Sequence, residues 1–267
     1  MTNWIEANGA SFRYDLQRRG AARTLVLVHE IGGAIESWDE ALPVFAQGFD
    51  VLRYDQRGFG LSEKCDALEI DGMVADLRAL LDALALTAPV CLAGAAMGAG
   101  IALAFAHAHP GRTQGLAIAS PALGYAPGTA PATLERRADI VLREGMRATT
   151  DLGFERSYPA ALRTPQAARL RFERYRRRWL GNDPQGVAAI SRVASRMHLA
   201  PLLGTLQCPT LVMGCTHDEI RPAAQSRRIA EQIPGARFVE IASGHFAAVQ
   251  TPALFAHTAS DFLLPLA

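Results

Sequence analysis

Short apolar runs alternate with longer segments of helical periodicity along most of the chain. The clearest run covers residues 24–28 and is almost wholly apolar, which is typical of a strand buried on both faces of a parallel sheet. Similar runs predict strands at 51–54, 89–93, 115–119, 209–213 and 237–241. Leucines at helical spacing predict a helix over 73–86, and further helices are predicted over 97–107 and 252–264. This alternation indicates an α/β fold.

The alternation breaks between residues 122 and 203, where the pattern is helical, polar and without a convincing strand. Residues 122–200 contain 14 Arg, no Lys and 7 Asp or Glu, so this segment is strongly basic within a chain of net charge +1. We interpret 122–203 as a helical cap inserted into a core made of residues 1–121 and 204–267. Its densest basic stretch is RLRFERYRRR at 169–178, expected to be mainly a solvated helix face. One or two of these arginines could point into a cleft, where arginine suits a carboxylate ligand.

Composition narrows the range of partners. A chain of 267 residues is long enough for one large α/β domain, and a net charge of +1 gives no global field for nucleic acid. The N-terminal sequence has no basic start followed by a long apolar run, and no stretch has the length of a membrane span. Four cysteines without a CxxC pair favour reduced thiols. We therefore expect a cytoplasmic protein that acts on a small molecule and could form a homo-oligomer.

Four short segments contain residues suited to catalysis, and each segment follows a predicted strand. They are HEIGG at 29–33, GAAMG at 94–98, GCTHD at 214–218 and SGHF at 243–246. Active sites of open α/β sheets form at the carboxyl ends of the strands, so these segments are expected to meet. The backbone N–H groups of Ile31 and Met97 could form an oxyanion hole there. The segment GAAMG has the spacing of Gly-x-Ser-x-Gly, but Ala96 occupies the serine position.

At these positions the chain resembles the α/β-hydrolase superfamily, whose order of elbow, acid and histidine it shares. The segment DQRGFGLS at 55–62 looks like the loop after the fourth strand in that family. The nearest resemblance is to 3-oxoadipate enol-lactonases, through SWDEALPVFAQGFDVLRYDQRGFGLSE and LVMGCTHDEIRP. The resemblance implies a mostly parallel eight-stranded sheet flanked by helices, with an inserted cap. It also implies that Asp218 is the catalytic acid and His245 the catalytic base.

Two residues depart from the family pattern. Ala96 replaces the nucleophilic serine, and Glu30 replaces the usual glycine of His-Gly-x-Gly. The stretch His-Glu-Ile-x-Gly resembles the corresponding loop of dienelactone hydrolases, where the glutamate takes part in proton transfer. One interpretation is that Glu30 acts with His245 on a water in the space vacated by the serine. The other is that Glu30 pairs with an arginine, such as Arg57 or one from the cap, and only fixes the loop.

The remaining candidates are weaker. Ser120 follows a predicted strand and is a candidate for substrate binding, although a turn role is common at such a position. Trp179 in the basic segment is a second candidate for lining the pocket. Cys215 begins the acid loop and is expected to be a packing residue. No cluster has metal-ligand spacing and no Gly-rich phosphate loop occurs, so neither a metal nor a cofactor is expected.

The sequence thus favours a cofactor-independent hydrolase of a small substrate, expected to bear a carboxylate. The bond cleaved would be a lactone, an amide or a C–C bond beside a carbonyl, with water activated by Glu30 and His245 in place of a serine. Three alternatives stay open. The same site could serve a cofactor-free lyase, isomerase or oxygenase; Ala96 could be a deliberate replacement in a serine esterase or enol-lactonase; or the protein could bind a ligand without turnover.

Overall fold

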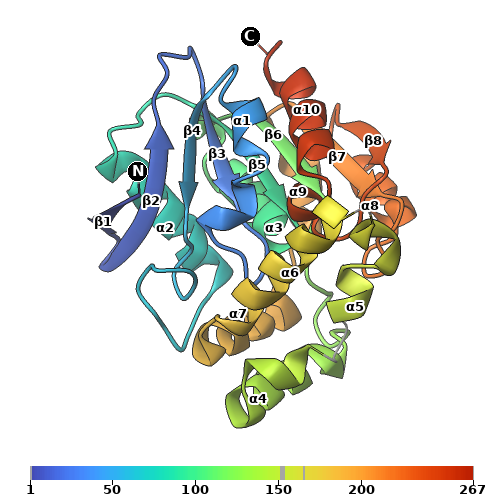
Figure 1. Ribbon diagram of the computed structural model, residues 1–267. Coiled ribbons are helices and arrows are strands. Elements are labelled where there is room, and N and C mark those ends of the chain that lie inside the picture. The colour runs from blue at the N-terminus through green and yellow to red at the C-terminus, as the bar shows by residue number, and fades with distance from the viewer. Residues whose placement is uncertain (1, 151–153, 165, 267) are drawn as a thin grey trace.

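A computed structural model describes residues 2–150, 154–164 and 166–266, in which an eight-stranded sheet carries helices on both faces (Figure 1). Neighbouring strands follow the order β1-β2-β4-β3-β5-β6-β7-β8. The strands are β1 Asn3–Ala7, β2 Ala10–Gln17, β3 Thr24–Val28, β4 Asp50–Tyr54, β5 Val90–Ala95, β6 Thr113–Ala119, β7 Thr210–Cys215 and β8 Arg237–Ile241. From β4 to β8 the neighbours are parallel, and β1 and β2 form an antiparallel edge. The mostly parallel sheet is confirmed.

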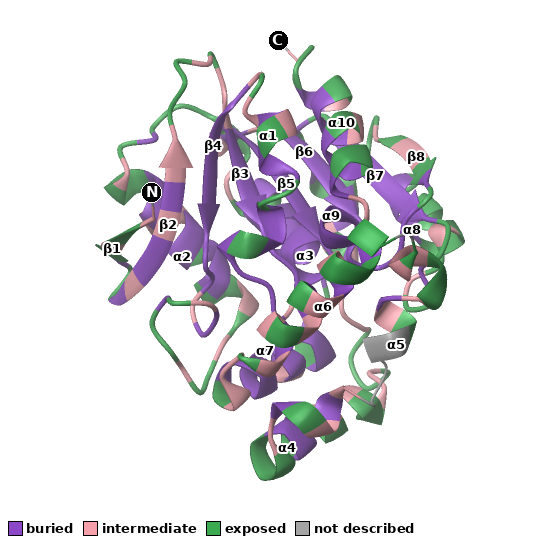
Figure 2. Ribbon diagram, in the orientation of Figure 1, coloured by how far each residue is buried: buried purple, intermediate pink, exposed green. Residues whose placement is uncertain are grey.

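Helices of the core cover the two faces of this sheet. They are α1 Leu42–Phe45, α2 Ile70–Ala83, α3 Met97–Ala108, α8 Ala223–Ala230, α9 Ala247–Gln250 and α10 Pro252–Leu263, with short 3₁₀ turns η1 Ile35–Trp38, η2 Pro110–Arg112 and η5 Ala200–Thr205. Alternate strand residues face opposite sides because successive side chains of a strand point in opposite directions. On β3, Val26 and Val28 belong to the cluster with α2, α3 and α8, whereas Leu25 and Leu27 belong to the cluster with α1 and α10. The central strands are therefore buried on both sides (Figure 2).

The segment between β6 and β7 contains the other helices. They are α4 Ala132–Glu144, η3 Met146–Thr149, α5 Phe154–Ser157, η4 Ala160–Arg163, α6 Gln166–Leu180 and α7 Pro184–Arg196. Figure 1 shows α4 to α7 gathered at the end of the sheet where the parallel strands terminate. An isolated β-bridge joins Gly124 to His198, so the two ends of the segment lie together. These helices cover the loops expected to carry the chemistry.

Several predicted boundaries differ from the structure by a few residues. The helix predicted over 73–86 extends over Ile70–Ala83. Its first turn has no apolar periodicity, which is why the leucine pattern alone places the start too late. Among the described residues, no helix has the length and apolar character needed to cross a membrane.

Candidate active site

Ala96 lies in the turn between β5 and α3, in the conformation of a nucleophile elbow. Its φ of 51° and ψ of −116° are unusual for a residue with a side chain. The N–H of Ala96 donates to Ala119 O at 3.0 Å, and the Ala96 carbonyl accepts the N–H of Ala122 at 2.9 Å. A Cβ on Gly98 would lie 2.0 Å from the carbonyl oxygen of Val28, so the close approach of α3 to β3 requires glycine there. The elbow is therefore held in place although it carries no nucleophile.

His245 and Asp218 form a hydrogen-bonded pair beside this elbow. The Nδ1 of His245 lies 2.9 Å from Oδ2 of Asp218, and both side chains are almost fully buried. The Oδ1 of Asp218 accepts the backbone N–H groups of Ile220 and Arg221, each at 2.8 Å. Burial raises the pKa of Asp218, but the hydrogen bond and charge of His245 outweigh it and leave the pKa below its ordinary value. An ionised Asp218 holds the proton on Nδ1, which leaves Nε2 of His245 as the basic atom.

The N–H groups of Ile31 and Met97 are both oriented by their local structure. Met97 is the first residue of α3, where the N–H has no acceptor within the helix. The carbonyl of Glu30 accepts the N–H of Gly33 at 3.0 Å and lies 2.8 Å from Nδ1 of His29. In a trans peptide the C=O of Glu30 and the N–H of Ile31 point in opposite directions. Ile31 and Met97 both line the same cavity as Ala96 and His245, as an oxyanion hole requires.

His29 fixes the loop that follows β3 through hydrogen bonds to Glu30 and Gln56. Its Nε2 accepts the backbone N–H of Gln56 at 3.0 Å, so the ring proton lies on Nδ1 and is donated to Glu30 O. The Gln56 amide returns a hydrogen bond to His29 O at 2.7 Å. His29 is completely buried, and burial lowers the pKa of its imidazole, although the charges of Glu30 and Asp55 act in the opposite direction. A neutral His29 therefore locks the peptide that presents the Ile31 amide.

The carboxylate of Glu30 lies away from the cavity that Ala96 and His245 line. It is 1% exposed, and its Oε1 accepts the hydroxyl of Ser37 at 2.8 Å. The Nη2 of Arg178, from α6, lies 3.9 Å from the same oxygen. The carboxyl group packs against the Cα of Gly33, where an added Cβ would lie within 2.9 Å of it. These contacts favour the interpretation in which Glu30 pairs with a cap arginine, namely Arg178; Arg57 pairs with Asp76 instead.

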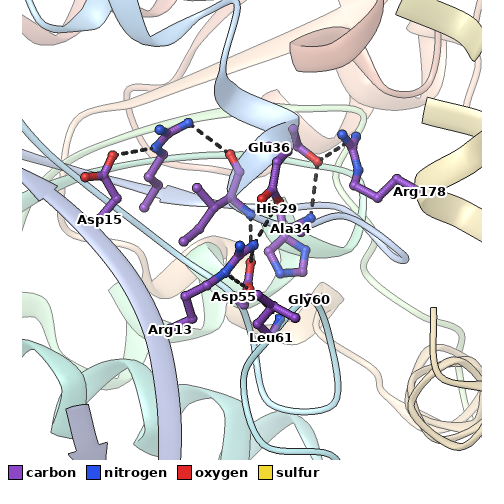
Figure 3. A network of polar contacts seen from close by, with 12 residues as sticks. Arg13, Asp15, His29, Ala34, Glu36, Asp55, Gly60, Leu61 and Arg178 are labelled. Carbon is purple, nitrogen blue, oxygen red and sulfur yellow. Dashed lines mark hydrogen bonds and ion pairs between the residues drawn. The ribbon is translucent and has the colours of Figure 1, made fainter. Parts of the chain in front are cut away.

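A second network joins the loop after β4 to the loop after β3 (Figure 3). Arg13 on β2 donates from Nε and Nη2 to the two oxygens of Asp55, at 2.5 and 3.1 Å. The same carboxylate accepts the N–H groups of Ile35 and Leu61, each at 2.7 Å. Gly60 packs so closely on Asp55 that any Cβ would collide with the carboxylate. Asp55 thus fixes both loops at once, which explains the need for an acid at 55 and a glycine at 60 in the DQRGFGLS segment.

Helix α6 of the cap and the residues just after it contact the loop at 29–33, which carries the Ile31 amide. Asn182, just after α6, donates from Nδ2 to the carbonyl of Gly32 at 3.0 Å. Gly32 has a φ of +70°, and an added Cβ would lie 2.5 Å from the ring of Trp179. Trp179 Nε1 donates to Thr149 Oγ1 at 3.0 Å, which sets the orientation of the indole. Trp179, a candidate for lining the substrate pocket, borders the cavity, and it also packs against the loop that carries Ile31.

A cavity of about 330 Å³ lies between the elbow, the dyad and the cap, a size suited to a small ligand. Its lining residues are Ile31, Ala96, Met97, Ala122, Tyr125, Thr133, Leu134, Arg137, Thr149, Arg156, Ser157, Trp179, Ala194, Ile220, Arg221, His245 and Phe246. Three arginines therefore face this space, and none of them belongs to the RLRFERYRRR stretch. Arg137 and Arg156 come from α4 and α5, and Arg221 lies three residues after Asp218. The sequence analysis identified none of the three as a cavity residue. Arg221 could have been considered, because it lies in the same loop as Asp218.

The arginine-rich stretch borders a different cavity. Arg171, Arg174, Arg177 and Arg178 line a second space of about 600 Å³ together with η1 and the Gly60 loop. Arg171 pairs with Glu40 at 2.7 Å, across this second space. The cap arginines that face the cleft are therefore Arg137 of α4 and Arg156 of α5, and no arginine of the RLRFERYRRR stretch lines it.

Ser120 and Cys215 lie behind the acid rather than in the cavity. Ser120 was a candidate for substrate binding, but its side chain is fully buried and it is not part of the cavity wall in the described structure. It lies close to Asp218, where its hydroxyl contributes to the low pKa of that carboxyl. Burial raises the pKa of the Cys215 thiol to about 12, so this thiol stays protonated and is a poor nucleophile.

The sheet topology, the elbow and the histidine–aspartate pair together define the chain as an α/β-hydrolase. A model of the family described as "Serine aminopeptidase, S33" matches residues 20–243, and the chain belongs to this family. The chain is 25% identical to a pyrrolizixenacetamide deacetylase of Xenorhabdus hominickii, over 98% of each protein. It is 28% identical to a 2-hydroxymuconate semialdehyde hydrolase of Pseudomonas sp. (strain CF600), over 97% of this chain and 93% of that protein.

The solved structures agree with this placement. An enol-lactonase from Burkholderia xenovorans LB400 superposes with a TM-score of 0.91 at 28% identity, over 98% of this chain and 99% of that one. The chain is therefore an enzyme of the hydrolase type that resembles the enol-lactonases, as the sequence motifs predict.

Proposed function

We propose that the protein is a cofactor-independent hydrolase that uses water directly, without a covalent intermediate, on a small carboxylate-bearing substrate. The observation that carries this proposal is the intact pair His245–Asp218 beside an elbow whose residue 96 is alanine. In this proposal His245 is the base, the amides of Ile31 and Met97 are the oxyanion donors, and the serine nucleophile is replaced by Ala96. Loss of a serine Oγ leaves room for about one water.

The chemical step then follows from the geometry. Nε2 of His245 takes a proton from the bound water while the water oxygen forms a bond to the carbonyl carbon. The carbonyl oxygen becomes an oxyanion, which the N–H groups of Ile31 and Met97 stabilise. The bond from the carbonyl carbon to the leaving oxygen, nitrogen or carbon breaks, and His245 returns the proton to the leaving group. The net reaction adds one water across the bond.

In this proposal Glu30 is a positioning residue. Its carboxylate accepts the hydroxyl of Ser37 and lies near Arg178, and it does not border the cavity in the described structure. The sequence hypothesis that Glu30 activates water would require its carboxylate to leave these contacts and reach the cavity. We therefore give the basic function to His245 alone.

Two further observations support the choice of substrate class. The names of similar proteins include a pyrrolizixenacetamide deacetylase, a 2-hydroxymuconate semialdehyde hydrolase and an enol-lactonase, so the named activities differ within this group. The cavity of this chain contains three arginines, which suit a carboxylate on the substrate. An amide, a lactone and a C–C bond beside a carbonyl all fit the same site chemistry.

The experiment uses 4-nitrophenyl hydrogen glutarate, an activated ester with a free carboxylate, together with a panel of small lactones and amides that carry one. We expect steady release of 4-nitrophenol without a burst, and no acyl adduct in intact-protein mass spectrometry after rapid quenching. His245→Gln and Asp218→Asn should each lower kcat by at least 10²-fold. A covalent adduct on the wild-type protein, or full turnover by His245→Gln, would overturn the proposal.

The product mass separates the other reactions of such a site. Summed product masses that exceed the substrate by one water indicate hydrolysis, an unchanged total indicates an isomerase or a lyase, and a gain of oxygen indicates an oxygenase. Tight binding without any product across the panel would instead support a ligand-binding protein and count against the hydrolase.

A further inference from the structure

We propose that Arg137 and Arg221 together form the binding site for the substrate's carboxylate, one guanidinium coming from the cap and the other from the acid loop. The inference rests on the proposed function in one respect, since the cavity is taken as the substrate site. It adds the residues that select the substrate by charge.

Arg137 is the more unusual of the two residues. It lies on α4, and its Nε donates to Ser191 Oγ of α7 at 3.0 Å. Its Nη2 is buried and has no hydrogen-bond partner, and no carboxylate of the described residues pairs with the guanidinium. Burial lowers the pKa of Arg137, and among the described residues two tyrosines, Tyr125 and Tyr175, act in the opposite direction. Arg137 as a whole is half-buried, but its Nη2 is shielded from water without an anion, so an anionic ligand would satisfy this donor.

Arg221 presents a second incompletely satisfied guanidinium to the same cavity. Its backbone N–H donates to Asp218, but its side-chain Nε is buried without a partner. Burial lowers the pKa of Arg221 as well, and its charged neighbour, Asp218, is already paired with His245. Tyr125 raises the pKa of both arginines, and Tyr125, Arg137 and Arg221 all line the same cavity.

The charge of the cavity wall points the same way. Arg156 supplies a third positive charge, although it is exposed and lies beside Glu219. Among the described lining residues there is no aspartate or glutamate, so the cavity carries positive charge without an acidic group of its own. A neutral ligand would leave Arg137 and Arg221 unpaired, whereas a carboxylate can accept hydrogen bonds from both.

The carboxylate that binds here is distinct from the group that reacts. The reacting carbonyl is expected at the amides of Ile31 and Met97, and the arginines come from other elements, α4 and the loop after β7. Binding of the carboxylate therefore joins a cap residue to a core residue while the carbonyl occupies the elbow. Two anchors of this kind fix the orientation of a small molecule in the site.

The test is a binding measurement without turnover. Glutarate and its uncharged diamide, glutaramide, have the same carbon chain and nearly the same shape, and calorimetry at low ionic strength would compare them. We expect glutarate to bind at least tenfold more tightly than glutaramide to wild-type protein. Arg137→Gln and Arg221→Gln should each weaken glutarate by at least tenfold and leave glutaramide unchanged. Arg143→Gln, an exposed arginine on the same helix α4, is the matched control and should bind like the wild type.

Further variants keep the result interpretable. If Arg137→Gln does not fold, Arg137→Lys retains the charge but loses the planar fork, and it should still bind glutarate less tightly. His245→Gln should bind glutarate normally, because that variant removes the chemistry only. If the wild-type protein binds glutarate as expected but hydrolyses none of the panel, that result would count against the proposed function alone and leave the carboxylate site standing. Three results would overturn the carboxylate site. The first is equal affinity of the wild type for glutarate and glutaramide, and the second is full glutarate affinity in the double variant Arg137→Gln/Arg221→Gln. The third is no glutarate binding at about 50 mM, a concentration far above the millimolar dissociation constants of weak ligands.

Discussion

The Nη2 of Arg178 in the cap lies 3.9 Å from Oε1 of Glu30 and 3.2 Å from the hydroxyl of Ser37. This contact joins α6 to the loop that presents the Ile31 amide. Asn182 and Trp179 contact Gly32 in the same loop, so the cap supports the loop that carries the Ile31 amide at several points. A change in Glu30 should therefore affect the shape of the loop before it affects the chemistry.

We predict that Glu30→Gln retains most activity. A glutamine can still accept the Ser37 hydroxyl, but it loses the attraction to Arg178, so we expect turnover of 4-nitrophenyl hydrogen glutarate to slow less than tenfold. The loss should cost about 1–2 kcal/mol of stability, because Arg178 keeps partial access to water. Kinetics and thermal unfolding on the same preparation measure both effects. If turnover instead slowed a thousandfold or more while stability stayed unchanged, Glu30 would return to the role of an acid or base.

A serine introduced at position 96 should act as a nucleophile. Residue 96 already has the positive φ of a nucleophile elbow, and His245 and the oxyanion donors are in place. We predict that Ala96→Ser reacts with a fluorophosphonate probe at residue 96 and gives a burst of 4-nitrophenol, whereas the wild type does neither. Peptide mass spectrometry locates the adduct. The double variant Ala96→Ser/His245→Gln is the control and should stay unlabelled; labelling of the wild type at another residue would show that a different nucleophile exists.

Much of this site could be predicted because its residues occupy fixed places after strands. The positions of Asp218, His245, Ile31 and Met97 follow from the order of apolar runs and turns, and the structure places them at the ends of β7, β8, β3 and β5. The long apolar runs of the central strands are reliable signals because both faces are buried. Charged partners such as Arg178 could not be assigned, since pairing across the cap depends on how α6 packs on the core.

The N-terminal hairpin shows the opposite case. The strands β1 and β2 lie at the edge of the sheet and alternate polar with apolar residues, so no apolar run marks them. The pair Asn8–Gly9 was the available signal, because both residues have a positive φ, as a two-residue hairpin turn requires. Arg137 had no comparable signal: its meaning depends on burial between α4 and α7, which a single sequence does not reveal.

Asp55→Asn should destabilise the protein strongly. The Asp55 carboxylate is fully buried, pairs with Arg13 and accepts the N–H groups of Ile35 and Leu61. Removing the negative charge leaves Arg13 buried with only the exposed Glu36 as a partner, a loss of about 3–5 kcal/mol for such pairs. For a domain of this size we expect a fall in Tm of roughly 10 °C, measured by circular dichroism. Glu144→Gln breaks an exposed pair with Arg143 and should shift Tm by about 2 °C or less. Equal shifts in the two variants would contradict the role of Asp55.

His29 should make stability depend on pH just below neutrality. Burial lowers the pKa of His29 in the folded protein, so below the ordinary value of about 6.5 the unfolded chain binds a proton that the folded state does not. The stabilising effect of neutral His29 is therefore complete above about pH 6.5 and is lost as pH falls toward the lowered pKa. The slope for one such proton is at most about 1.4 kcal/mol of stability per pH unit.

We predict that the Tm of the wild type decreases between about pH 7.5 and about pH 5.5 more steeply than that of His29→Gln, whose side chain does not titrate. His107→Gln, an exposed histidine, is the control and should retain the wild-type slope. Parallel curves for wild type and His29→Gln would show that His29 is not the group that titrates.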